Sequence, residues 1–396
     1  MTKFNAGEWS EAYLLLRLVG DGRIYAGNEN LERSDDVYMD IKSVLKRNVD
    51  NVLECNRKDC VAECWLLYDD GRKSEHIIVP VSRFSEMADI LLQQIKNRPK
   101  KGSFSAPEPY EFLKSIGNES IKAGKPKKGS PYEDYFKGKT DIVLRVVYQR
   151  ENSTLGFSVK SALGSSPTLF NTASASAFEF CLENCTKEDF VNLNNLLSAS
   201  GHPDVMKRVE YIRNHNIKAN FTHTRICLPS KKNKFTEKGP HFEWNITLLD
   251  TIMPKVLAEA ILIRYGYYGT NCIKCTDIIS DLCRLNPLRV RNPKIFYRTK
   301  LEDFVYASFG QMTASEEWDG RHIINGGYIE IKKNGEILYY RANSDDKFKN
   351  YLITKTYFES PSTNLNDKKY YHGIVWTDGN KYYLSLNFSV RFYKYG

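Results

Sequence analysis

The sequence predicts a mixed α/β protein, and three observations lead to that prediction. Residues 140–161 form two β-branched, largely apolar runs around a polar turn, as in a strand hairpin. Residues 186–285 contain several segments of helical periodicity that begin and end at capping residues. Residues 326–396 are rich in aromatic residues and contain the turn dipeptides Asn334-Gly335 and Asp378-Gly379. With 396 residues, of which 41% are hydrophobic, two or three domains are expected rather than one.

The first expected element is a helix over about residues 7–19. Asn5 and Glu8 have the spacing of a capping box, in which the two residues satisfy each other's backbone N–H groups. Helical spacing then places Glu11 on the apolar stripe of this helix. A carboxylate in such a position is expected only if it is paired or binds a metal ion. Glu11 is therefore a candidate ligand, and the alternative is that it is only a surface residue while Glu8 is only a cap.

Residues 35–98 are predicted to form a mixed unit. We expect a helix near residues 38–48, a hairpin that pairs residues 62–68 with residues 75–81, and a helix over residues 84–96. Residues 97–139 are rich in Pro, Gly, Ser and Lys, which indicates a linker or a loop that faces nucleic acid, with a short helix near residues 110–116.

The hairpin at residues 140–161 carries the strongest chemical signal in the chain. Asp141 opens its first strand, and the alternation of the second strand puts Val159 on one face and Ser158 and Lys160 on the other. An aspartate on one strand therefore faces a lysine on its neighbour. A metal-dependent phosphodiesterase needs such a pair, because the carboxylate binds Mg²⁺ while the amine orients or deprotonates the attacking water.

Beyond the hairpin, helices are expected over residues 186–199, 203–214, 254–267 and 276–285, because Pro, Gly and capping residues stand at their ends. Residues 326–396 are expected to be mostly β.

The net charge of +9 permits a polyanionic partner without requiring one. Lysines and arginines gather in three runs, over residues 96–139, 231–238 and 284–300, and the first run directly precedes Asp141. Basic runs in loops are usually only solvated, but beside a phosphodiesterase centre they are expected to contact phosphates. The candidates for DNA contact in the first run are Lys125, Lys127, Lys128 and Lys139.

The nine cysteines are an odd number, which argues against a complete set of disulfides and favours a cytoplasmic protein. Three closely spaced pairs allow a zinc interpretation, but no nearby His or second pair completes a tetrahedral set. We therefore prefer the interpretation that these cysteines are small apolar residues on helix faces. The sequence contains no apolar run of about 18 residues, so a membrane span is not expected.

Asp141 with Ser158-Val159-Lys160 resembles the signature of the PD-(D/E)XK nucleases, and the surrounding residues narrow the resemblance to the HpaII family of type II restriction endonucleases. The similar blocks run from near the N-terminus to the last expected strand: residues 7–14, 139–142, 155–164, 167–174, 317–320, 326–336, 351–363 and 386–392. The resemblance thus covers most of the chain. It implies a PD-(D/E)XK core with a mixed central sheet flanked by helices, together with an N-terminal accessory region and a β-rich C-terminal region.

One position departs from the nuclease signature, because Ser158 stands where the second acid is expected, two residues before Lys160. A single carboxylate is a poor Mg²⁺ site, since such sites use one or two carboxylates together with phosphate oxygens. Many nucleases of this superfamily bring an acid from their first helix. We therefore expect Glu11 to be the second ligand, with Glu8 next and Glu179 a more distant candidate.

The resemblance implies a Mg²⁺-dependent endonuclease that cuts both strands of DNA at a short site, with CCGG as the default target. Asp141, the Val159 carbonyl and Glu11 or Glu8 would bind the metal ion. Lys160 would orient the attacking water. Ser158 would hold a water or a phosphate oxygen, and Ser161 would contact DNA. A homodimer would supply two centres for two strands, with a monomer that cuts the strands one after the other as the alternative. A cognate DNA methyltransferase is expected because the host's own sites need protection.

Two alternatives remain open: a structure-specific or repair nuclease of the same superfamily, and a non-catalytic DNA-binding module. The expected regions are a first helix packed on the catalytic core at residues 1–30, an accessory DNA-contacting region at residues 31–139, the catalytic core at residues 140–300 and a β-rich region at residues 301–396.

Overall fold

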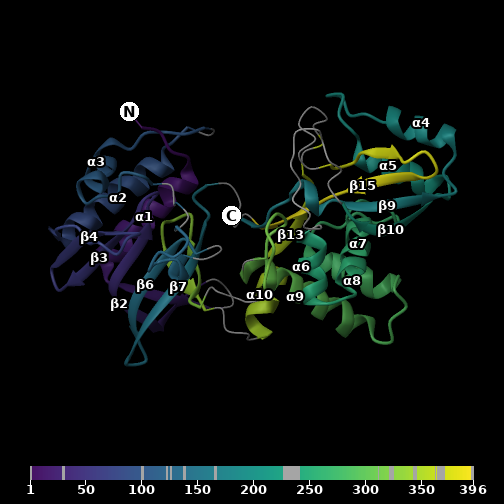
Figure 1. The fold of residues 1–396 in the computed structure, drawn as a ribbon. Helices are drawn as coiled ribbons and strands as arrows, with labels where there is room; N and C mark the ends of the chain where they lie inside the picture. Colours follow the sequence, from purple (N-terminus) through teal and green to yellow (C-terminus); the bar gives the residue numbers. More distant parts are fainter. Residues whose placement is uncertain are drawn as a thin grey trace. The chain divides into compact units, whose positions relative to one another are not determined.

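The computed structural model of the chain describes residues 2–28, 32–99, 102–121, 124, 127–136, 140–164, 167–225, 241–310, 312–320, 325–341, 346–361, 363 and 371–393. By contacts the chain forms two compact units, each with its own sheet and helices (Figure 1). Unit 1 consists of Met1–Pro167, His322–Phe348 and Lys394–Gly396, and unit 2 of Thr168–Arg321 and Lys349–Tyr393. This division groups the hairpin at residues 140–161 with the N-terminal part of the chain. The functional roles expected for the four sequence regions stay predictions.

The helices of unit 1 agree with the sequence-based expectations. α1 (Ala6–Asp21) begins with the predicted capping box: the Asn5 side chain accepts from the Glu8 N–H at 3.0 Å, and the Glu8 carboxylate accepts from the Asn5 N–H at 2.8 Å. The helix ends at Gly22, whose positive φ of 68° favours glycine. α2 (Val81–Lys96) and α3 (Pro107–Ser115) confirm the helices predicted over residues 84–96 and near residues 110–116.

The sheet of unit 1 has nine strands in the order β1-β12-β11-β7-β6-β2-β3-β4-β5. Their bounds are β1 Arg23–Gly27, β2 Arg33–Arg47, β3 Asn51–Lys58, β4 Val61–Tyr68, β5 Ile77–Pro80, β6 Ile142–Tyr148, β7 Glu151–Ser161, β11 Gly327–Ile331 and β12 Ile337–Tyr340; the short 3-10 helix η1 is Asp134–Phe136. The predicted pairings of β4 with β5, β6 with β7 and β11 with β12 are all present and antiparallel. β11 also pairs in parallel with β7, with Glu330 opposite Lys160.

The helix expected near residues 38–48 is wrong, because this segment is part of β2. β2 pairs with β3 on one side and with β6 on the other, so its residues are held by two neighbouring strands. Its side chains alternate between two apolar clusters: Val44 packs in the larger cluster together with α1, and Leu45 packs in the smaller one on the other face. Sheet pairing has overridden the helical periodicity here.

The hairpin that carries Asp141 is tighter than the sequence suggested. Only Gln149 and Arg150 form its turn, and their positive φ angles of 51° and 70° are those of a two-residue hairpin loop. The pairing of Ile142 with Phe157 places Asp141 next to Ser158 at the start of β6. The hairpin therefore aligns the two halves of the predicted motif.

Unit 2 contains a four-stranded sheet, β10-β9-β15-β14, and a three-stranded sheet, β13-β16-β8. Its strands are β8 Thr168–Phe170, β9 Phe178–Glu183, β10 Lys218–Thr224, β13 Thr356–Glu359, β14 Val375–Thr377, β15 Tyr382–Leu386 and β16 Ser389–Phe392. Its helices are η2 Ser174–Ser176, α4 Lys187–Asn195, α5 Val205–Asn214, α6 His241–Leu249, α7 Met253–Arg264, α8 Cys275–Leu285 and α9 Pro293–Gly310, and α10 Asp346–Thr354 spans the boundary of the two units. The four expected helices are confirmed as α4, α5, α7 and α8, whereas α6, α9 and α10 were not predicted.

The cysteines in the described part of the chain are all free thiols. None of the helices described combines the length and the apolar character that a membrane span requires.

Candidate active site

Asp141 lies at the start of β6 and is held by the neighbouring strand. Its backbone N–H donates to the Phe157 carbonyl at 2.9 Å. Its carboxylate oxygen Oδ2 accepts from the Val159 N–H at 2.7 Å and from the Ser158 hydroxyl at 3.3 Å. Because both of these bonds go to Oδ2, the orientation of the carboxylate is fixed while Oδ1 takes part in neither.

Lys160 interacts electrostatically with Asp141, so the structure brings together the two residues of the predicted pair. Burial raises the pKa of Asp141, while Lys160, the Val159 N–H and the Ser158 hydroxyl oppose this shift. Burial also lowers the pKa of Lys160, and the charges of Asp141 and Glu11 act against it. Each ionised group is thus destabilised by loss of water and supported by its opposite charge.

Glu11 projects from α1 to the same place. Its side chain is 28% exposed, and burial raises its pKa to about 7. The negative charges of Asp141 and Glu8 add to this increase, whereas Lys46 lowers the pKa. Glu11 therefore belongs to the Asp141–Lys160 cluster. Glu8 lies close enough to influence Glu11, but one of its oxygens serves the capping box.

Lys46 on β2 is the charged residue of this cluster that the sequence did not reveal. Its ammonium nitrogen lies 3.6 Å from Glu11 Oε2, and its side chain is 1% exposed. Lys46 was missed because residues 38–48 were predicted to form a helix. Read as a strand, the alternation of β2 would have placed Lys46 on the same face as Val44, towards α1.

Glu179, the more distant candidate for the second acid, belongs to unit 2 and has its own partners there. Its carboxylate accepts from Arg225 at 3.1 Å, from the Trp376 indole N–H at 2.9 Å and from the Ser385 hydroxyl at 2.5 Å. These contacts give it a structural role in the sheet of unit 2.

The residues predicted to contact DNA are placed only in part. Lys127 and Lys128 are exposed, whereas Lys125 and Lys139 lie outside the described residues. The Ser161 hydroxyl donates to the Ser10 hydroxyl at 2.9 Å and accepts from the Leu163 N–H at 3.1 Å. Ser161 thus ties β7 to α1.

The donor set at this corner suits a hard divalent cation. Two carboxylates, Asp141 and Glu11, lie together with raised pKa values, so a bound cation would relieve their mutual repulsion. Oxygen ligands of this kind bind Mg²⁺, which usually takes one or two carboxylates from the protein and the remaining ligands from water or phosphate. The described residues contain no group of three or more His, Cys, Asp or Glu that could hold a metal ion.

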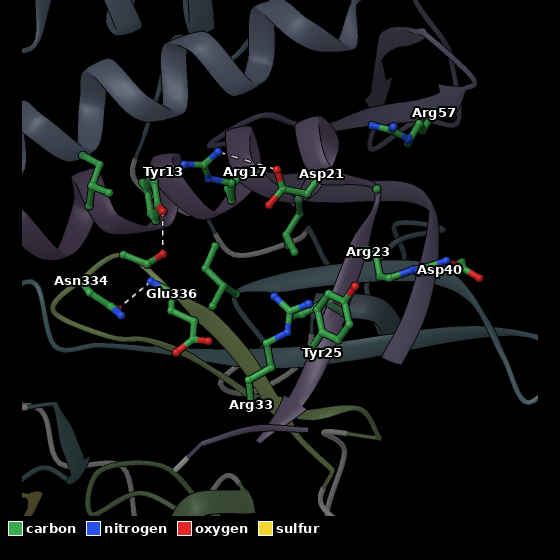
Figure 2. A pocket seen from close by; sticks show the side chains of 16 residues that line it. Tyr13, Arg17, Asp21, Arg23, Tyr25, Arg33, Asp40, Arg57, Asn334 and Glu336 are labelled. Carbon is green, nitrogen blue, oxygen red and sulfur yellow. Dashed lines mark hydrogen bonds and ion pairs between the residues drawn. The ribbon is translucent and has the colours of Figure 1, made fainter. Parts of the chain in front are cut away.

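Unit 1 also contains a polar cavity of about 740 Å³, lined by residues of α1, β1, β2 and the β11–β12 hairpin (Figure 2). Two of its arginines lie near carboxylates that also line it: Arg17 lies 3.7 Å from Asp21, and Arg23 lies 2.8 Å from Asp40. The cavity is separate from the candidate centre, because its lining does not include Glu11, Lys46, Asp141 or Lys160.

An aspartate, a glutamate and a lysine gathered at one corner of a sheet are typical of nucleases that hydrolyse phosphodiester bonds with the help of a metal ion. Comparison with known proteins agrees with this class. The model of the HpaII restriction endonuclease family matches residues 5–392. The type II restriction enzyme HpaII of Haemophilus parainfluenzae is 31% identical over 401 residues, which cover 99% of this chain and 100% of that protein.

The chain therefore belongs to the HpaII restriction endonuclease family, as the sequence blocks indicated. It is an enzyme, a type II site-specific deoxyribonuclease. No solved structure matches the chain.

Proposed function

We propose that this enzyme hydrolyses both strands of double-stranded DNA at the sequence CCGG in a reaction that requires Mg²⁺. The observation that carries the proposal is the meeting of Asp141, Glu11 and Lys160 at one corner of the unit 1 sheet. Family membership over nearly the whole chain supports the reaction class. The resemblance of the same hairpin to the PD-(D/E)XK signature supports the assignment of the β6–β7 corner to a nuclease core of that type.

Asp141, Glu11 and the backbone carbonyl of Val159 are the proposed metal ligands, with Glu8 as the weaker choice because it is engaged at the helix cap. A divalent cation at this place supplies positive charge to the phosphate oxygens as negative charge builds up on them. Asp141 is already oriented for this task, since Val159 and Ser158 hold its Oδ2. We thus assign Ser158 a part in orienting this carboxylate, in place of the missing acid.

Lys160 is proposed to orient the attacking water and to offset charge on the phosphate. Its lowered pKa makes its ammonium a better proton donor than that of an exposed lysine, and makes the neutral amine, the form that accepts a proton from water, easier to reach. The negative charges of Asp141 and Glu11 favour its protonated form. A lysine in this environment is suited to both tasks.

DNA contact is proposed for the basic segment before Asp141, namely Lys125, Lys127, Lys128 and Lys139, and for Ser161. The exposed positions of Lys127 and Lys128 are compatible with phosphate contacts. A homodimer would provide the two centres that a double-strand cut needs, and a cognate methyltransferase would protect the same site in the host.

Digestion of plasmid and phage DNA tests this proposal. Incubation with Mg²⁺ should give discrete fragments, and run-off sequencing of their ends should show CCGG at every cut. EDTA should prevent cleavage. Asp141→Ala should abolish cleavage yet still bind a CCGG duplex in Ca²⁺, while Asp40→Ala, a control at a half-exposed aspartate of the same sheet, should cleave normally. Full cleavage by Asp141→Ala would contradict the assigned centre, and cleavage of branched DNA alone would contradict the sequence-specific reaction.

A further inference from the structure

Lys46 occupies a position that normally takes an apolar residue. It is the second-last residue of β2, and it pairs with Leu53 of β3 and Ile142 of β6. Ile142 belongs to the apolar cluster that includes α1, so the Lys46 side chain extends from the sheet towards that helix. A lysine that is 1% exposed within a central strand needs partners for its charge.

Two groups meet the Lys46 ammonium. The Ile121 carbonyl accepts a hydrogen bond from it at 2.9 Å, and Glu11 Oε2 lies 3.6 Å away. Asp141 also interacts electrostatically with Lys46. The ammonium is therefore anchored by the protein backbone on one side and reaches the proposed metal-binding acids on the other.

We infer that Lys46 is a positioning residue that fixes the Glu11 carboxylate next to Asp141 and so replaces the orientation that an acid at position 158 would have had from the strand itself. This inference rests on the proposed function of Glu11 as a metal ligand. An acid two residues before Lys160 would be held by the backbone of β7, close to the carboxylate at position 141. Glu11 instead comes from a helix on a longer, rotatable side chain, and the buried ammonium limits its rotamers through Oε2.

The charge of Lys46 and its contact with Glu11 have opposite expected effects on the affinity for a metal ion. If Lys46 acted only as a nearby positive charge, its removal would strengthen binding of a cation. If Lys46 holds Glu11 in place, its removal should weaken binding, as the loss of an outer partner of a metal ligand generally does.

The experiment measures binding of Mn²⁺ to the full chain without DNA, by the EPR signal of the free ion. Lys46→Met should weaken the affinity by about 10-fold or more, and Glu11→Gln should weaken it as well. The double variant should bind no more weakly than Glu11→Gln, because Lys46 acts through Glu11. The matched control is Lys300→Met, which removes the same charge from another ion-paired lysine, the partner of Asp250 in unit 2, and should leave the affinity unchanged.

Three other results would contradict either the role of Lys46 or the proposed metal site. Mn²⁺ binding by Lys46→Met that equals or exceeds wild type overturns the inference, while weak binding by Glu11→Gln in the same series leaves the proposed function intact. A double variant much weaker than Glu11→Gln also overturns it, since Lys46 would then act elsewhere. Wild-type affinity in Glu11→Gln would instead refute the proposed metal site itself.

A second variant covers the case in which Lys46→Met does not fold, as judged by thermal melting. Lys46→Arg keeps the buried positive charge but replaces the ammonium with a larger planar guanidinium, so the contact with Glu11 Oε2 changes while the charge does not. An affinity about 10-fold below wild type supports positioning by Lys46, and an unchanged affinity overturns it.

Discussion

Glu179 in unit 2 and Asp141 in unit 1 are both enclosed carboxylates, but their neighbours differ. Glu179 is 1% exposed, and both of its oxygens are occupied, one by Arg225 and the other by Trp376 and Ser385. Asp141 receives hydrogen bonds at one oxygen, and burial raises its pKa despite Lys160. A carboxylate whose partners are complete stabilises a fold, whereas one whose charge is incompletely offset is available to bind a cation.

The largest expected effect is that of Asp141→Asn on cleavage. Asp141 is a proposed metal ligand, and the loss of several kcal/mol of transition-state stabilisation corresponds to a rate reduction of about 1000-fold or more. The melting temperature at pH 8 should not fall, because the variant removes a charge that burial disfavours. Single-turnover cleavage and thermal melting measure both quantities. A variant that loses stability but keeps its rate would show that Asp141, like Glu179, has a structural role.

Glu179→Leu should have the opposite pattern. It leaves Arg225, which is 9% exposed, without its carboxylate, and it removes the acceptor of Trp376 and Ser385. Breaking a buried ion pair in this way typically lowers the free energy of unfolding by about 3–5 kcal/mol. Urea denaturation should detect this loss, and Glu183→Leu at the exposed end of the same strand should lower the value by less than about 1 kcal/mol. Similar losses in the two variants would argue against a structural role for Glu179.

The pH dependence of metal binding tests the role of Glu11, the third carboxylate in question. The pKa of Glu11 is raised from 4.5 to about 7, so in the folded protein this carboxylate holds a proton between these values that the unfolded chain has released. The contribution of Glu11 to stability therefore falls as pH rises from 4.5 to 7, and metal binding must displace the proton. The affinity for Mn²⁺ should drop about 50-fold from pH 7 to pH 5. A pH-independent affinity in the wild type, or an unchanged pH dependence in Glu11→Gln, would contradict this expectation.

The smallest predicted effect concerns His372 in unit 2, which is 2% exposed. Its ring accepts from the Asn387 N–H at 3.0 Å and meets the Ser360 hydroxyl at 3.0 Å, and burial lowers its pKa to about 3. The unfolded chain takes up a proton here near pH 6.5 and the folded chain does not, so stability is present above pH 6.5 and is lost as pH falls towards 3. Urea unfolding should show about 2 kcal/mol less stability at pH 5 than at pH 7 from this group. In His372→Gln the difference in stability between pH 7 and pH 5 should be smaller by this amount. An unchanged difference would refute the prediction.

The parts that the sequence revealed are those determined by neighbours along the chain. The capping box of Asn5 and Glu8, the tight hairpin that brings Asp141 to Ser158, and the Asn334-Gly335 turn all depend on a few consecutive residues. Glu11 could be selected as a candidate ligand because a carboxylate on the apolar stripe of a helix is costly unless it is paired or binds a cation.

The parts that it concealed depend on partners far away in the sequence. β2 is a strand because β3 and β6 pair with it on both sides, and local periodicity contains no information about those partners. Lys46 was missed for the same reason, since its burial and its contact with Glu11 exist only after the sheet and α1 have packed. The parallel pairing of β11 with β7 joins Glu330 to Lys160 across 170 residues, beyond the range of any local pattern.

That parallel pairing also has a consequence for synthesis. The chain leaves unit 1 after residue 167 and returns at residue 322 to add β11 beside β7 and β12 beside β1. A nascent chain on the ribosome can form the β6–β7 hairpin early, yet the edge next to Lys160 stays without its neighbour until most of the polypeptide has been translated. Lys160 therefore gains both of its neighbouring strands only late in synthesis, after β11 has been made.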